Sequence, residues 1–256
     1  MSWDPQQYLK FAAPRLRPAL DLLAAVPSTE PAVVFDLGCG AGNVTRLLAE
    51  RWPHASLTGI DDSAPMLAKA ALEVAGVHWL QQDLAHWRAD RPADVIYSNA
   101  ALHWLPDHAR LFPLLVDQLA PGGVLAVQMP RNFEAPSHAL IGDTVRAGPW
   151  RARLEPLLSP SPVAPPAFYY GVLAPHVARL DIWETEYLQV LTGADPVKEW
   201  TKRTWLKQFL EALAEPERSA FEEDYAARLR SAYPAEADGK TLFPFRRLFI
   251  VAVAHD

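Results

Sequence analysis

Cysteine is almost absent from this chain, since Cys39 is the only one among its 256 residues. One thiol cannot form an internal disulfide or a zinc cluster of several cysteines, so the fold depends on its hydrophobic core. Positive charge is not in excess either: 30 Asp and Glu outnumber 24 Lys and Arg, which gives a net charge of −6. This balance argues against general binding to nucleic acid or to membrane surfaces.

Long hydrophobic runs are also missing. The longest, residues 248–254, is far shorter than the ~20 residues that a membrane-spanning helix needs. The chain starts with neither the positive nor the apolar region of a secretory signal. The eight histidines show no spacing typical of a metal site, and we expect no metal. These absences predict a soluble, cytoplasmic protein, and its 50% hydrophobic residues are typical of a globular domain.

What is present is an alternation of short apolar runs with helical patterns. It predicts strands at residues 32–35, 57–60, 77–80, 95–97 and 124–128, and helices at 44–52, 64–74 and 107–119, the last with Asp107 as its N-cap. Such alternation is typical of a parallel sheet with helices on both faces. Two later strands, at 182–191 and 248–254, are expected at an antiparallel edge. The fold class is therefore α/β: a doubly wound, Rossmann-like seven-stranded sheet whose last strand is antiparallel.

The other segments are interpreted as additions to a single domain. We expect N-terminal helices in residues 1–30, a cofactor-binding core in 31–130, a proline-rich loop region in 131–180, a helical cap insertion in 192–240 and a final strand in 241–256. The 24 prolines are nearly double the usual ~5% of residues, and several of them gather in the predicted loop. A long loop next to aromatic residues is interpreted as a cover over a site, with a plain surface loop as the alternative.

The clearest chemical signal is the turn Asp36-Leu37-Gly38-Cys39-Gly40-Ala41-Gly42, which follows the first predicted strand. Its glycines permit a tight turn and let a ligand approach the backbone, and the following helix offers unpaired N–H groups. A dinucleotide site favours Gly-x-Gly-x-x-Gly, whereas here the third glycine comes one residue early. The carboxylate of Asp36 would repel a pyrophosphate and suits a ligand with an ammonium group. An ordinary glycine-rich turn is the alternative, and Cys39 is interpreted as a small filler.

Polar residues also follow the next predicted strands. Asp61 ends the second, where a carboxylate can accept hydrogen bonds from ribose hydroxyls. Asp83 is expected to end the third and suits the exocyclic amine of adenine, and Asn99 ends the fourth. One such residue is usually a helix cap or a solvated group. Because parallel strands end at the same edge of a sheet, all of these residues together predict a nucleoside-binding site.

These residues resemble the class I S-adenosylmethionine-dependent methyltransferases. The glycine turn matches their first motif, and Gly59-Ile60-Asp61, Asp83 and Pro121-Gly122-Gly123 match later ones. The resemblance implies S-adenosyl-L-methionine as the methyl donor. It also implies which residues bind each part of the cofactor. The methionyl part is assigned to Asp36, Gly38, Gly40 and Gly42, the ribose to Asp61, and the adenine to Asp83 and Leu84. We add Asn99 to the cofactor-binding residues.

A narrower resemblance, to the trans-aconitate 2-methyltransferases, covers nearly the whole chain. It is carried by the segments Trp3-Asp4-Pro5-Gln6-Gln7-Tyr8-Leu9, Arg15-Leu16-Arg17-Pro18-Ala19, Tyr97-Ser98-Asn99-Ala100-Ala101-Leu102-His103-Trp104 and Phe243-Pro244-Phe245-Arg246-Arg247-Leu248-Phe249-Ile250-Val251-Ala252. It implies methyl transfer to a carboxylate of trans-aconitate, which gives a monomethyl ester and S-adenosylhomocysteine. His103 stands where relatives often carry Gln, so the acceptor stays open at this point.

A carboxylate is already a nucleophile at neutral pH, so no catalytic base is expected and the enzyme acts by positioning. A small tricarboxylate needs local positive charge, and Arg suits bidentate carboxylate recognition. Arg246 and Arg247 must face opposite sides of the last strand, and the resemblance favours Arg247. Arg15 and Arg131 are further candidates. The predicted substrate-binding residues are Tyr8, Arg17, His103, Trp104 and Arg247.

Other functions remain open at the level of sequence. Within the class, the acceptor is alternatively another small or carrier-bound acid, or a natural-product oxygen. A nicotinamide-dependent oxidoreductase is disfavoured by the glycine spacing, and a non-catalytic module that kept the cofactor fold is a third class. The expected partner is a small anionic substrate, with no nucleic acid and no membrane.

Overall fold

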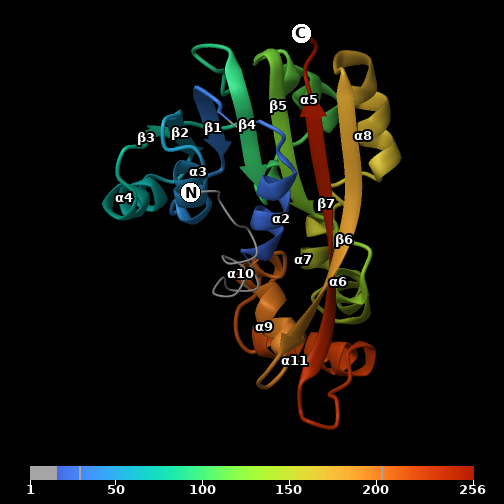
Figure 1. The fold of residues 1–256 in the computed structure, drawn as a ribbon. Helices are drawn as coiled ribbons and strands as arrows, with labels where there is room; N and C mark the ends of the chain where they lie inside the picture. The colour runs from blue at the N-terminus through green and yellow to red at the C-terminus, as the bar shows by residue number, and fades with distance from the viewer. Residues whose placement is uncertain (1–15, 29, 203) are drawn as a thin grey trace. The chain divides into compact units, whose positions relative to one another are not determined.

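The computed structural model describes residues 16–28, 30–202 and 204–256. Its seven-stranded sheet has the order β3-β2-β1-β4-β5-β7-β6 (Figure 1). The strands are β1 (Val33–Leu37), β2 (Ser56–Asp61), β3 (His78–Gln81), β4 (Ala93–Asn99), β5 (Leu119–Pro130), β6 (Arg179–Leu191) and β7 (Thr241–Val253). The predicted doubly wound fold is confirmed.

The first five strands are parallel. β1 lies between β2 and β4, β2 pairs with β3, and β4 pairs with β5. The inner strands β1 and β4 are largely buried, which explains their short continuous apolar runs. The carboxyl ends of the parallel strands therefore lie at one edge of the sheet, as was expected from the sequence.

β7 runs antiparallel to both of its neighbours. Ala254 N donates to Gly123 O at 2.8 Å and Arg131 N donates to Arg246 O at 2.9 Å, so β5 and β7 keep one antiparallel register. The hydrogen bond from Ala178 N to Val253 O, 2.9 Å, joins β6 to the same strand. β7 begins at Thr241, within the bounds 241–256 given for the final strand, and the apolar run 248–254 covers only its second half. The strand includes Pro244, a residue type that ordinarily marks a strand as interrupted.

The chain divides into two compact units. The first takes the residues up to Met129, Pro162–Thr185 and Arg247–Asp256; the second takes Pro130–Ser161 and Glu186–Arg246. The helices of the first unit are α2 (Arg17–Ala25), α3 (Asn43–Arg51), α4 (Ala64–Glu73), α5 (His108–Val116), α8 (Pro166–Leu173) and the short 3-10 turns η1 (Leu102–Trp104) and η3 (Ala174–His176). Asp107 holds the predicted N-cap position of α5 but its side chain makes no capping hydrogen bond, because its backbone is left-handed, with φ 54°.

Most of the predicted proline-rich loop region is helical. Residues 131–180 contain α6 (Pro136–Ala147), α7 (Arg151–Leu154), η2 (Glu155–Leu157), α8 and η3, and residues 158–165 form an irregular segment. Pro136 and Pro166 are the first residues of their helices, where a missing N–H costs nothing. The loop prediction was therefore wrong for most of this region, and the cover that it was expected to form stays a prediction.

The second unit has its own hydrophobic core. Its later helices are α9 (Pro196–Lys202), α10 (Lys207–Glu211) and α11 (Glu217–Ala232). Trp150, Phe209, Phe221 and Tyr225 are all buried in this core. The helical insertion predicted between the last two strands therefore forms, together with α6 and α7, a separately packed unit.

Candidate functional site

The glycine turn between β1 and α3 is fixed to the neighbouring strand. Gly38 N and Cys39 N both donate to Ile60 O, at 2.8 and 3.0 Å. Gly38 has φ +75°, and a Cβ built on it would lie 2.1 Å from Ala101 Cβ, so only glycine fits. The thiol of Cys39 is buried and burial raises its pKa, which agrees with the interpretation of this residue as a filler.

Gly40 presents open backbone at the same turn. Its N–H donates to Asp61 Oδ2 at 2.8 Å, and a Cβ built on it would meet no atom within 4 Å. The other oxygen of Asp61 accepts from Ser63 N at 3.0 Å. A carboxylate has about four lone-pair sites, so Asp61 can still accept hydrogen bonds from a ribose. The turn and Asp61 together fit a nucleoside with its sugar at the end of β2.

Asp36 lies under the turn as a buried carboxylate. It is 2% exposed and accepts a 2.6 Å hydrogen bond from Thr45 Oγ1. Burial raises its pKa from 3.8 to about 7, the hydrogen bond from Thr45 opposes that rise, and the charge of Asp61 adds to it. Asp36 is therefore close to half protonated at neutral pH. A cationic ligand group beside it would favour the charged form.

We expect ligand binding and stability to depend on the protonation of Asp36. In the folded protein the Asp36 carboxyl keeps its proton up to about pH 7, whereas in the unfolded chain it loses that proton near pH 3.8. The free energy of unfolding should therefore fall as the pH rises from about 4 to about 7. A ligand carrying an ammonium group should expel that proton, so S-adenosylhomocysteine should release about one proton on binding near pH 6. Calorimetry in buffers of different ionisation heat measures this release. Asp36→Asn should abolish it, and equal proton release by the variant would contradict the assignment.

The predicted adenine-side residues lie on the loop after β3. Asp83 is two residues beyond the end of that strand; it accepts from Ala85 N at 2.9 Å and contacts His86 Nδ1 at 3.1 Å. The hydrogen bond from Ala85, followed by that from His86, lowers its pKa. Leu84 reaches the glycine turn, since its Cδ1 lies 3.7 Å from a Cβ built on Gly38. Leu84 thus lies beside the turn, while Asp83 offers a solvent-exposed carboxylate.

β4 ends in a strained turn. Asn99 is its last residue, and Asn99 Oδ1 is buried without a hydrogen-bond partner among the described residues. Ala100 follows with φ 55°, a conformation that costs a residue other than glycine about 1–2 kcal/mol. An orphaned amide oxygen is suited to the ammonium group of a ligand. Ser98, in contrast, donates to Leu37 O at 2.9 Å and joins β4 to β1.

His103 and Trp104 follow on the 3-10 turn η1. The His103 ring is buried and tilts against Trp104 at 4.6 Å between centroids, whereas Trp104 is 58% exposed and is not a core residue. Burial, then the positive charge of Arg247, then His108, lowers the pKa of His103 to about 3. The positive charge of Arg247 therefore acts on His103 through space, and His103 stays neutral.

His108 supports this turn and was not predicted. Its Nε2 lies 3.0 Å from Leu102 O and its Nδ1 lies 2.7 Å from the hydroxyl of Tyr169, so the ring connects η1 to α8. No local pattern reveals such a contact, because Tyr169 lies far along the chain.

The structure does not place the other candidate substrate residues beside His103. Tyr8 and Arg15 lie outside the described residues. Arg17 is exposed at the start of α2 and pairs with Asp21 at 3.9 Å. Arg131 belongs to the second unit, as does Arg246, which is exposed and lies 3.9 Å from Glu186. Among the predicted substrate residues, His103 contacts Trp104 and is influenced by the charge of Arg247.

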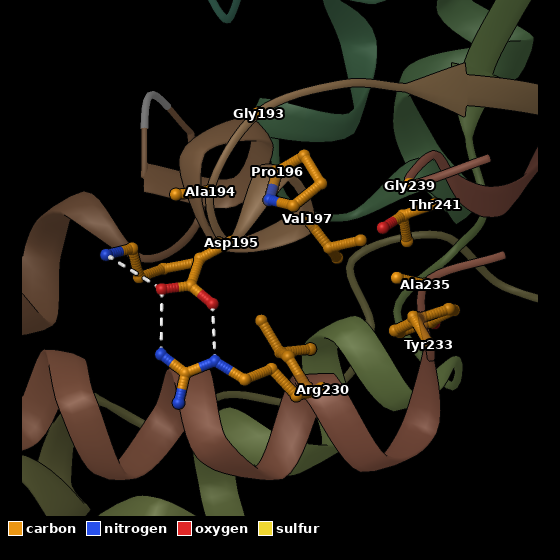
Figure 2. Close-up of a pocket in the computed structure, with 12 residues that line it drawn as sticks. Gly193, Ala194, Asp195, Pro196, Val197, Arg230, Tyr233, Ala235, Gly239 and Thr241 are labelled. Atoms are coloured by element: carbon orange, nitrogen blue, oxygen red, sulfur yellow. Dashed lines mark hydrogen bonds and ion pairs between the residues drawn. The ribbon is translucent and has the colours of Figure 1, made fainter. Parts of the chain in front are cut away.

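The second unit contains a pocket of its own, of about 460 Å³ (Figure 2). Asp195 accepts two hydrogen bonds from Arg230, at 2.7 and 2.9 Å, and Lys198 Nζ lies 3.9 Å away. Lys198 Nζ also lies 3.4 Å from Glu199 Oε1 and Arg230 Nη1 lies 3.0 Å from Glu223 Oε1, so each cation already has carboxylate partners. None of the predicted site residues lines the pocket. The charged side chains that line this pocket are therefore engaged in ion pairs within the protein.

The described residues contain no group of three His, Cys, Asp or Glu side chains that could hold a metal ion. The helices in the same part of the chain are all too short or too polar to cross a lipid bilayer.

Comparisons with known proteins place this geometry in context. The family described as "Methyltransferase domain" matches residues 34–123. The chain is 51% identical to the trans-aconitate 2-methyltransferase of Azoarcus sp. (strain BH72) over 98% of its own length and 99% of the relative.

Solved structures share the fold at low identity. A putative methyltransferase from Bacillus halodurans C-125 matches with a TM-score of 0.59 and 14% identity over 93% of this chain and 99% of that one. A phosphoethanolamine N-methyltransferase 2 of Haemonchus contortus, bound to S-adenosylhomocysteine, matches with a TM-score of 0.55 and 16% identity. It covers 93% of this chain, which spans 52% of that enzyme's length.

Proposed function

This chain belongs to the trans-aconitate 2-methyltransferase family and is an S-adenosylmethionine-dependent methyltransferase, and from that premise we propose that it methylates a carboxylate of trans-aconitate. The products are the monomethyl ester and S-adenosylhomocysteine. The observation that supports the acceptor half is the charge of Arg247 acting on the buried ring of His103 at the end of β4, in a protein with a net charge of −6.

The cofactor half rests on the strand ends. Three features suit a nucleoside that carries a positive charge. A ligand can approach the backbone of Gly40, Asp61 can accept further hydrogen bonds, and Asn99 Oδ1 has no hydrogen-bond partner among the described residues. We assign the methionyl part to Asp36 and the glycine turn, the ribose to Asp61, and the adenine to Asp83 and Leu84. When bound, S-adenosyl-L-methionine supplies a methyl group on a positively charged sulfur.

The chemistry requires no proton transfer. A carboxylate oxygen forms the new C–O bond while the C–S bond breaks, and a negative and a positive charge disappear together. A cation on the reacting oxygen would weaken that nucleophile, so we assign Arg247 to a carboxylate of the acceptor that does not react. His103 is neutral and can donate one hydrogen bond without adding a second charge. The protein then contributes mainly alignment, which can supply about 7–11 kcal/mol in favourable cases.

A methyl-transfer assay over a panel of di- and tricarboxylates tests this function. We expect trans-aconitate to be methylated with the highest kcat/KM. Citrate is a useful control, because it carries three carboxylates on a saturated, non-planar skeleton. The proposal fails if trans-aconitate is not methylated, or if citrate is methylated equally well.

A further inference from the structure

Gln128 is a buried amide near the carboxyl end of β5. Its side chain is 0% exposed, and neither Oε1 nor Nε2 has a hydrogen-bond partner among the described residues. Its backbone is engaged, since Gln128 O accepts from Ala100 N at 2.8 Å. Buried amide atoms without partners are rare, because the group loses its hydrogen bonds to water and gains none in exchange. The side chain is therefore suited to a partner from outside the chain.

The sheet register identifies the neighbours of Gln128. Asn99 of β4 is its direct partner, so the two amides lie on the same face, and Asn99 Oδ1 is orphaned as well. On the other side, the antiparallel register places Phe249 of β7 opposite Gln128. Phe249 stacks on Trp183 with 4.8 Å between ring centroids and 7° between planes. The buried amide thus lies between a second amide and an aromatic pair.

The same face carries the residues assigned to the acceptor. Arg247 stands two residues before Phe249 and so points to the same side of β7. The charge of Arg247 acts on His103, which follows Asn99 along the chain. Gln128 therefore lies between Asn99 and Phe249 on this face, and Arg247 stands on the same face two residues from Phe249.

We propose that Gln128 binds the acceptor, with its Nε2–H groups donating to a carboxylate oxygen; this inference rests on the proposed function. A carboxylate accepts hydrogen bonds and cannot donate them, so it pairs with the nitrogen end of the amide. The oxygen end suits the positive charge of the methyl donor. An amide is also neutral, so it orients a carboxylate without the full loss of nucleophilicity that a second arginine would cause.

Gln128→Met tests the proposal, because it keeps the side-chain length and removes both orphaned atoms. We expect the melting temperature of the ligand-free protein to rise by about 2–6 °C. The KM for trans-aconitate should rise about 10-fold or more, with the Kd for S-adenosylhomocysteine unchanged. Gln118→Met is the matched control. That amide accepts from Ala89 N and donates to Leu114 O, so its loss should lower the melting temperature and leave KM unchanged.

A lower melting temperature for Gln128→Met would overturn the proposal, because the amide would then be bonded in the free protein. An unchanged acceptor KM, or a weaker Kd for S-adenosylhomocysteine in its place, would overturn it too. Failure of the proposed function looks different: the wild type then leaves trans-aconitate unmethylated. The acceptor measurement would then move to whichever acid of the panel the wild type does methylate, and if it methylates none, this proposal falls with the proposed function.

Discussion

Gly40→Ala is expected to weaken S-adenosylhomocysteine binding by about 10–100-fold, which corresponds to the 1–3 kcal/mol that an extra methyl group costs in a packed site. The new Cβ meets no protein atom within 4 Å, so it projects into the open space where a ligand approaches the turn. The backbone has φ +54°, so alanine also costs about 1–2 kcal/mol of stability. Calorimetry for binding and thermal unfolding for stability separate the two effects.

Gly76→Ala is the matched control for this experiment. Gly76 has φ +76°, and a Cβ built on it also meets nothing within 4 Å, but it lies in the turn before β3, away from the strand ends that carry the site. It should show the same loss of stability with unchanged binding.

Gly38→Ala should behave differently again: the collision with Ala101 adds to the left-handed strain and destabilises the free protein by about 2–5 kcal/mol. Equal binding losses in the Gly40 and Gly76 variants would remove Gly40 from the site.

The residues proposed to bind the cofactor could be predicted from the sequence because their signals are local. Asp36, Asp61 and Asn99 stand at or near the ends of largely buried strands, and such strands show as continuous apolar runs. Asp83 follows the more exposed edge strand β3. Asp36, Gly40 and Asp61 needed only the rule that parallel strands end at one edge of the sheet. The structure then added what no local pattern contains, such as the clash that makes Gly38 obligatory.

The acceptor half depends on contacts between distant parts of the chain. Gln128 had one weak signal, as a polar residue in the otherwise apolar run Val124-Leu125-Ala126-Val127-Gln128-Met129. Its importance follows only from the register with β4 and β7. His108 had no signal, because its role depends on Tyr169 in α8. The proline-rich region was misjudged for a related reason: proline breaks helices in their interior but starts them at the first position, and spacing alone does not distinguish the two.

Arg247→Ala is expected to raise the KM for trans-aconitate by about 10–150-fold, the range for losing hydrogen bonds between charged groups. Arg247→Lys keeps the charge but loses the planar fork, so its KM should lie between wild type and Ala. The contact is assigned to a carboxylate that does not react, so it persists from ground state to transition state and kcat should change little. Steady-state kinetics on both variants measures this order, and the Kd for S-adenosylhomocysteine should stay constant.

Arg246→Ala is the control from the same strand, because that side chain is exposed and pairs with Glu186. An exposed pair is worth about 0–1 kcal/mol, so this variant should keep the wild-type KM. The pKa of His103 gives an independent check: Arg247 helps to lower it, so Arg247→Ala should raise that pKa and Arg247→Lys should raise it less. An NMR titration of the ring reports this without substrate. If KM stays at the wild-type value in Arg247→Ala while the pKa of His103 rises, Arg247 lies beside His103 but does not bind the acceptor, and the carboxylate role passes to another cation such as Arg17.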